Sequence, residues 1–157
     1  MRHSAWLILA ALSIALAGCS NAPVPAAPHV KAIEAAAHGG YVAAINSNDV
    51  ETLMADLTDD VVYQAPGAPE VIGKAAVRAW VADYFGAYST KWEKTSIGFT
   101  VSGDWAFERY TYKSTDTDKK SGAVTSDVGK GINVYRRGPD GKWRVAIDGW
   151  SSDKPAT

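Results

Sequence analysis

The chain has 157 residues, a formal net charge of −1 at neutral pH, 46% hydrophobic residues and one cysteine, Cys19. The near-neutral charge, without a basic stripe, argues against nucleic-acid binding. One cysteine cannot form a disulfide within the chain. This length and composition predict one domain that buries a sizeable hydrophobic core without crosslinks.

The first residues have the layout of a secretory signal: a basic start at residues 2–3, an apolar run over 6–17 and small residues before Cys19. The apolar run is shorter than the about 20 residues that a membrane-spanning helix needs. Residues 16–19, Leu-Ala-Gly-Cys, resemble the lipobox of a bacterial lipoprotein signal peptide. The resemblance implies removal of residues 1–18 and lipidation of Cys19, with a diacylglycerol on the sulfur and an acyl chain such as palmitate on the amine. An ordinary signal peptide with an incidental cysteine is the alternative.

The segment after the lipobox is expected to be a tether. Residues 20–30 carry three prolines among small residues, a composition that favours an extended spacer. The predicted organisation is therefore a lipidated tether over residues 19–30, a domain over 31–153 and a tail over 154–157. Ser20 rather than aspartate follows the cysteine, and by analogy with lipoprotein sorting this favours the outer membrane, facing the periplasm.

Three helices are predicted in the first part of the domain. Residues 31–46 place apolar side chains at helical spacing. A second helix, ending at about residue 57, follows the N-capping segment 47–49. A strand over residues 61–65 separates it from a third helix over 74–88, whose apolar positions recur at i, i+3 and i+4.

From residue 92 onward the apolar period changes to two, which predicts strands. They are expected at residues 92–101, 105–114, 128–137 and 142–151. Tight glycine-containing turns join the first pair and the last pair, whereas a long polar loop over 115–126 joins the middle pair. Early helices and late strands predict an α+β fold with one curved antiparallel sheet.

Four segments resemble the nuclear transport factor 2-like superfamily, which has a cystatin-like cone fold, and within it the SnoaL-like branch that is related to ketosteroid isomerases. They are Tyr41-Val42-Ala43-Ala44-Ile45-Asn46 with Asp49, Asp59-Asp60-Val61-Val62, Gly73-Lys74-Ala75-Ala76-Val77, and the stretch 129–151. The resemblance covers residues 31–153. It implies a cone-shaped sheet wrapped around three N-terminal helices, a pocket at the open end, and a homodimer formed through the outer sheet face.

The resemblance also implies positions for a site. Ketosteroid isomerases combine an aspartate base with an oxyanion hole made of a tyrosine and a protonated aspartic acid. Here the tyrosine falls on Tyr41 and the oxyanion aspartic acid on Asn133, whose amide can still donate a hydrogen bond. The base falls on Ala65, which cannot carry a proton. Standard isomerase chemistry is therefore not expected, and whether the chain is an enzyme stays open.

Two carboxylates in otherwise apolar strands could act as a relocated base: Asp148 first and Glu108 second. A buried carboxylate without a cation has a raised pKa, which suits proton transfer. Each also has a structural interpretation. Glu108 could pair with Arg109 or Arg144 across strands, and Asp148 could accept a hydrogen bond from a neighbouring tyrosine or tryptophan.

The sequence favours a binding module whose pocket holds a small, mostly apolar molecule. The residues expected to contact it are Tyr41, Tyr63, Trp80, Tyr84, Tyr110, Asn133 and Trp150. The alternatives are an isomerase, cyclase or dehydratase that uses Asp148 or Glu108, and an envelope interaction domain with a vestigial pocket. No metal or cofactor is expected, because His29 and His38 form no ligand cluster and there is no glycine-rich phosphate loop.

Overall fold

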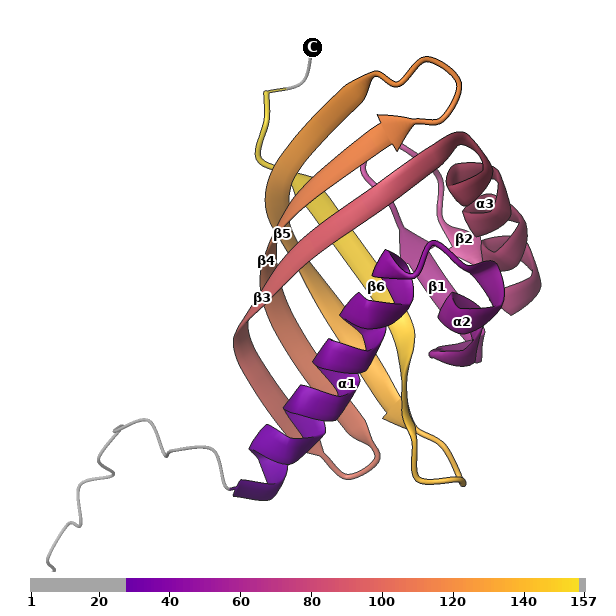
Figure 1. Ribbon diagram of the computed structural model, residues 1–157. Helices are drawn as coiled ribbons and strands as arrows, with labels where there is room; N and C mark the ends of the chain where they lie inside the picture. The colour runs from indigo at the N-terminus through magenta and orange to yellow at the C-terminus, as the bar shows by residue number, and fades with distance from the viewer. Residues whose placement is uncertain (1–27, 156–157) are drawn as a thin grey trace, which may run out of the picture.

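The computed structural model describes residues 28–155, so the predicted signal peptide, Cys19 and most of the predicted tether lie outside the described residues. The helices are α1 (Pro28–Asn46), α2 (Val50–Ala55) and α3 (Lys74–Ala87), and the strands are β1 (Leu57–Gln64), β2 (Val71–Ile72), β3 (Tyr88–Ser102), β4 (Trp105–Asp118), β5 (Val124–Arg137) and β6 (Trp143–Ser152). Figure 1 shows the long strands as a curved sheet with the helices on its concave side.

The six strands have the order β2-β1-β6-β5-β4-β3. β3 to β6 form an antiparallel meander that places Asn133 opposite both Glu108 on β4 and Asp148 on β6. β1 pairs with β6 in parallel, so Tyr63 lies beside Asp148. The predicted α+β fold with early helices and a curved sheet is confirmed. The sheet is mixed rather than wholly antiparallel, because the long connection between β1 and β6 can return the chain in the same direction.

The predicted polar loop over residues 115–126 is mostly strand. β4 continues to Asp118 and β5 begins at Val124, so only a short turn joins them. The pairs in this extension include Thr115 with Ser126 and Thr117 with Val124. This segment was predicted to be a loop because most of its residues are polar. Threonine, however, is β-branched and suits a pleated strand.

α2 ends earlier and β1 begins earlier than predicted. The backbone N–H of Asp56 donates to the carbonyl groups of Leu53 and Met54 and ends the helix. β1 then starts at Leu57, which is fully buried. The polar residues 58–60 and a register shift before Val62 break the alternation of the strand, which explains why its first half was not predicted.

Two asparagines hold the end of α1 against the edge strand β3. The Asn46 amide donates to the Trp92 carbonyl (2.8 Å) and accepts from the Trp92 N–H (2.7 Å). Asn48 makes the same pair of bonds with Thr90, at 2.9 and 2.7 Å. These amides satisfy backbone groups that a sheet edge would otherwise leave unpaired. They therefore fix α1 across the concave face, where its side chains face the cavity described below.

The two faces of the sheet differ in what they bury. The core lies between the helices and the concave face and includes Leu57, Val61, Val77, Val81 and Val145, all fully buried. The outer face exposes apolar side chains from β3, β4, β5 and β6, namely Ile97, Phe107, Ile132 and Ile147, which are 36% to 53% exposed. Within residues 28–155 no helix is both long and apolar enough to cross a membrane.

Candidate functional site

A cavity of about 220 Å³ lies between the helices and the concave face. Its walls are mainly aromatic and come from Tyr63, Trp80, Tyr84, Trp92 and Trp150. Its polar lining includes the carboxylates of Asp116, Asp127 and Asp148. Several of these side chains are only half-buried, so the cavity reaches the surface. Sites for drug-sized ligands occupy about 300–1,000 Å³, so this cavity suits a smaller molecule.

Asp148 is the centre of a hydrogen-bonded chain on the cavity floor. Its Oδ2 accepts from the Tyr41 hydroxyl at 2.7 Å, and its Oδ1 accepts from the Tyr110 hydroxyl at 2.8 Å. The Tyr63 hydroxyl lies 2.9 Å from the Tyr41 hydroxyl. Because Tyr41 donates its proton to Asp148, Tyr63 must donate to Tyr41. The chain therefore joins α1, β1, β4 and β6 at one carboxylate.

The three tyrosines of this hydrogen-bonded chain stay protonated at physiological pH. Burial raises the pKa of Tyr41, Tyr63 and Tyr110 well above the ordinary value, and the negative charge of Asp148 raises each of them further. They are therefore neutral hydrogen-bond donors and cannot act as bases. Among the four hydrogen-bonded groups, the Asp148 carboxylate is therefore the one that could act as a base.

A buried lysine lies behind the carboxylate. The Lys94 ammonium donates to Asn133 Oδ1 at 2.8 Å, is 4.0 Å from Asp148 Oδ2, and lies 3.6 Å from the centre of the Tyr110 ring. Burial lowers the pKa of Lys94, and the charges of Asp148 and Glu108 oppose that change. Lys94 was not among the site residues predicted from the sequence. Its position, two residues after Trp92 on the same strand face, was the available signal.

Glu108 belongs to a separate buried cluster. Its Oε1 lies 2.6 Å from His38 Nδ1, and its Oε2 accepts from the Tyr135 hydroxyl at 2.6 Å. Burial opposes ionisation, but these two contacts outweigh it and lower the pKa of Glu108. The expected pairing with Arg109 or Arg144 is wrong, because Arg144 binds Asp140 instead and Arg109 packs on Gly98. Successive side chains of a strand point to opposite faces of the sheet, so Arg109 lies on the face opposite to Glu108, which contacts His38 on α1.

The predicted ligand-contacting residues fall into two groups. Tyr41, Tyr63, Trp80, Tyr84 and Trp150 line the cavity together with Asp148. Tyr110 and Asn133 lie behind Asp148 instead, and both are fully buried. Tyr110 reaches Asp148 because Gly131 faces it, and a Cβ on Gly131 would overlap the Tyr110 hydroxyl. Glu108 does not line the cavity, so Asp148 is the one of the two predicted bases that a ligand can reach.

Three further lining residues were not predicted: Trp92, Asp116 and Asp127. The carboxylate of Asp116 accepts from the hydroxyls of Tyr84 (2.6 Å) and Thr90 (2.5 Å). Asp127 accepts from the hydroxyls of Tyr112 (2.7 Å) and Ser152 (2.6 Å). Asp116 lies in the segment 115–126 that was predicted to be a polar loop. It faces the cavity because β4 extends past residue 114 and keeps its alternation.

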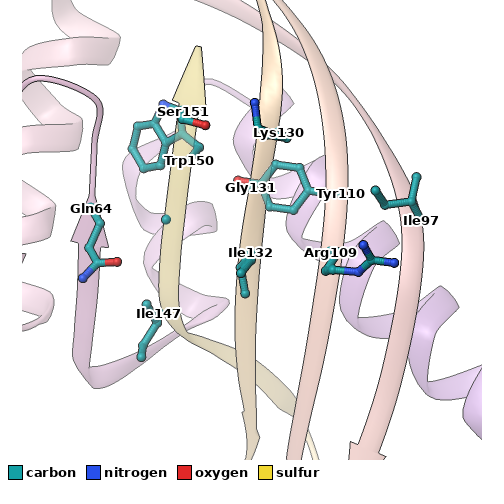
Figure 2. Close-up of a pocket in the computed structure, with 11 residues that line it drawn as sticks. Gln64, Ile97, Arg109, Tyr110, Lys130, Gly131, Ile132, Ile147, Trp150 and Ser151 are labelled. Atoms are coloured by element: carbon teal, nitrogen blue, oxygen red, sulfur yellow. The ribbon is translucent and has the colours of Figure 1, made fainter. Parts of the chain in front are cut away.

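A second hollow of about 590 Å³ lies on the outer face of the sheet (Figure 2). Ile97, Ile132 and Ile147 line it, together with Arg109 and Lys130. Although it is the larger of the two, it contains neither predicted base, and its isoleucines are exposed on the surface. The candidate site is therefore the cavity on the concave side, which combines enclosure, aromatic walls and a buried carboxylate.

Comparisons with known proteins support this fold. Residues 39–146 match the family described as SnoaL-like domain. Among solved structures, the chain is similar to a ketosteroid isomerase-like protein from Erwinia carotovora atroseptica, with a TM-score of 0.72, 29% identity, and coverage of 82% of this chain and 98% of that one. Among curated proteins, none matches the chain.

Two more distant structures share the fold. One is a nuclear transport factor 2-like protein with a cystatin-like fold from Novosphingobium aromaticivorans (TM-score 0.65, 21% identity, covering 82% of this chain and 84% of that one). The other is a nuclear transport factor 2-like superfamily protein from Salmonella enterica serovar Typhimurium (TM-score 0.65, 17% identity, covering 82% and 94%). Because the family match spans most of the domain, from α1 into β6, the chain belongs to the SnoaL-like domain family.

Proposed function

We propose that the cavity on the concave side binds a small organic molecule and that Asp148, with the hydroxyls of Tyr41 and Tyr63, holds its polar end. The position of Asp148 carries this proposal, because it is a buried carboxylate that lines a mainly aromatic cavity and is held by two phenol hydroxyls. Apolar walls with a few placed polar groups are typical of small-molecule sites. The open volume disfavours the alternative in which aromatic side chains fill the cone and only the sheet surface is used.

Native mass spectrometry of the protein purified from its host tests this proposal. We expect a retained small-molecule mass in the wild type and its loss in Trp80→Ala, which removes part of the wall. Tyr135→Phe is the matched control, because its hydroxyl binds Glu108 and does not line the cavity. A wild-type protein without added mass, or a ligand that Trp80→Ala retains in full, would count against the proposal.

Proton-transfer catalysis is the second candidate function. A specific observation favours it: Asp148 lines the cavity and has neutral phenols beside it, which can donate to an oxyanion that forms on a substrate. In such a step the Asp148 carboxylate takes a proton from carbon next to a carbonyl group and later returns it. Deuterium exchange at the α-carbons of cyclohexanone in heavy water tests this activity. Exchange that is equal in wild type and Asp148→Asn would exclude Asp148 as the base.

We also propose that Cys19 anchors the domain to the bacterial envelope, with the domain facing the periplasm. The support is the Leu-Ala-Gly-Cys motif after an apolar run and the proline-rich segment that follows it. Metabolic labelling with an alkyne fatty acid tests this. Label should enter the wild type and be absent from Cys19→Ser. Equal labelling of both proteins would refute the assignment.

A homodimer through the outer sheet face is the remaining proposal about partners. Ile97, Phe107, Ile132 and Ile147 form an exposed apolar patch on four neighbouring strands, and such patches mark interaction sites. A two-fold dimer would bury the same patch on both copies. Light scattering should give twice the monomer mass for the wild type and the monomer mass for Ile132→Glu. A wild-type monomer at high concentration would exclude the dimer.

A further inference from the structure

We infer that the ligand of the cavity on the concave side is an organic cation with an alkylated ammonium group. The inference rests on the proposed small-molecule binding at the same cavity and adds the chemical class of the ligand. It adds a charged group to the small, mostly apolar molecule that the sequence predicts. Three features carry it: the arrangement of the aromatic rings, the carboxylates among them, and the placement of the nearest lysine.

Four of the aromatic rings that line the cavity contact one another edge to face. The Trp92 and Trp150 ring planes meet at 89° with centroids 6.2 Å apart, and those of Tyr63 and Trp150 at 87° and 6.0 Å. The Tyr63 and Trp80 ring planes meet at 80° with centroids 5.9 Å apart. In each of these pairs the edge of one ring packs on the face of the other, and Trp80 also stacks on Tyr84 with centroids 5.5 Å apart. All five rings line the cavity, so a ligand in it would meet mainly aromatic surface. An ammonium group within about 6 Å of a ring centroid is attracted by the ring quadrupole, most strongly by tryptophan.

Asp116 and Asp127, two of the three carboxylates that line the cavity, are held by hydroxyl groups. Asp116 is held by the hydroxyls of Tyr84 and Thr90, and Asp127 by those of Tyr112 and Ser152. Within residues 28–155, no lysine, arginine or histidine nitrogen lies within 4.0 Å of either carboxylate. Burial opposes the ionisation of Asp127, but the Ser152 and Tyr112 hydroxyls, together with the Val128 N–H and the charge of Lys154, outweigh it and lower the pKa of Asp127. Both carboxylates are therefore held by hydroxyl groups and not by a cationic side chain within 4.0 Å.

The buried lysine does not cancel the charge of these two carboxylates. Lys94 does not line the cavity, and it lies behind Asp148 with its ammonium on Asn133 and the Tyr110 ring. Asp148 and Glu108 both act on Lys94 electrostatically, so its charge is matched inside the protein. Lys154 attracts Asp127 from a distance, but its ammonium donates to the Ser126 carbonyl. The lining itself has no cationic side chain among the described residues, and two of its three carboxylates, Asp116 and Asp127, are not paired with Lys94.

These features favour an organic cation over a metal ion. In the part of the chain that the structure describes, no three carboxylate, histidine or cysteine side chains are grouped closely enough to hold a metal ion. A hard metal ion needs several oxygen ligands at once. An alkylated ammonium group instead spreads its charge over a surface that aromatic faces can cover. The Lys94 ammonium above the Tyr110 ring shows that this chain uses the same interaction within its own fold.

Choline and its uncharged isostere 3,3-dimethylbutan-1-ol form a matched pair of probes, because they share a shape and differ in charge. Isothermal titration calorimetry should show choline binding about tenfold or more tightly than the alcohol. Asp116→Asn and Asp127→Asn should each weaken choline several-fold and leave the alcohol unchanged. Asp104→Asn is the control, since it removes the same charge from the turn between β3 and β4, where Asp104 binds Arg137. Melting temperatures confirm that each variant is folded.

The outcomes separate this inference from the proposal on which it rests. If the alcohol binds as tightly as choline, the cation inference is overturned and small-molecule binding stands. If Asp104→Asn weakens choline as much as the two cavity variants, general surface charge explains the effect and the inference is again overturned. If neither probe binds, the cation inference fails, and the mass-spectrometry experiment on Trp80→Ala decides the proposed function by itself.

Discussion

The Tyr41 hydroxyl donates to Asp148 Oδ2 over 2.7 Å and thereby ties α1 to β6 across the floor of the cavity. Both residues are almost fully buried, at 2% and 5% exposed. One hydrogen bond thus fixes the helix that closes the cone and the carboxylate that a ligand would meet. Stability and ligand binding are therefore expected to respond together when it is removed.

Tyr41→Phe should lower the free energy of unfolding by about 1.5–3 kcal/mol, the usual contribution of a hydrogen bond to a charged group. The change leaves Asp148 Oδ2 without its phenol donor and leaves Tyr63 without an acceptor. Urea unfolding measures the loss. Tyr88→Phe is the control, because the Tyr88 ring packs on Tyr84 but its hydroxyl has no described side-chain partner. Equal losses for both variants would show that the Asp148 bond has no special role.

Lys94→Met should destabilise the protein by about 3–5 kcal/mol, as expected when one partner of a buried charged pair is removed. The variant leaves Asp148 and Glu108 without their buried cation. Adding Asp148→Asn should restore part of the loss, and a double-mutant cycle in urea should give a coupling of about 1 kcal/mol or more. Additive losses would mean that Lys94 stabilises the fold through packing alone.

Two glycine substitutions should have opposite effects. Gly131→Ala should cost about 1–3 kcal/mol or more, because the new Cβ would overlap the Tyr110 hydroxyl and the Gly149 carbonyl. Gly39→Ala should instead add about 0.5–1 kcal/mol, since this position in α1 is open and alanine is the better helix former. Thermal unfolding compares both with the wild type. A harmless Gly131→Ala would show that Tyr110 does not need to pass so close to β5.

The sequence was sufficient to predict the strands that carry a regular alternation. β3, β4, β5 and β6 were found because apolar side chains recur at every second position. The same period placed Asp148 and Glu108 inside the fold, and both are buried. Tyr41 was selected through the family resemblance, and the structure places it on the cavity. Local pattern therefore predicted the sheet and the carboxylates in it.

The local sequence pattern could not predict which side chains bind those carboxylates. Glu108 is bound by His38 from α1 and Tyr135 from β5, and only the tertiary packing of the helix on the sheet decides that choice. Lys94 was overlooked because a lysine in a strand is normally exposed. Asp116 was overlooked because the strand that carries it looked like a polar loop. In each case, long-range contacts determined the position of a polar side chain.

Alkaline pH should unfold this protein through its buried tyrosines. Burial raises the pKa of Tyr41, Tyr63, Tyr110 and Tyr135 above the ordinary value of 10.0, and it raises that of Tyr84 to about 12. Above that ordinary value the unfolded chain loses protons that the folded protein keeps, so stability falls as pH rises. Each fully buried tyrosine contributes about 1.4 kcal/mol per pH unit to this fall.

A typical domain has a free energy of unfolding of about 5–15 kcal/mol. Four such tyrosines should together reduce it to zero within a few pH units above their ordinary pKa. The lowered pKa of Lys94 acts in the opposite sense, but its contribution ends at the ordinary lysine value of 10.5. Phenolate absorbance and circular dichroism should therefore change in a single cooperative step as pH increases. Tyr135→Phe removes one such group and should make that step less steep in pH. Gradual ionisation of the buried tyrosines while the circular dichroism stays native would contradict this account, because it would mean that water reaches Asp148 and its phenols in the folded state.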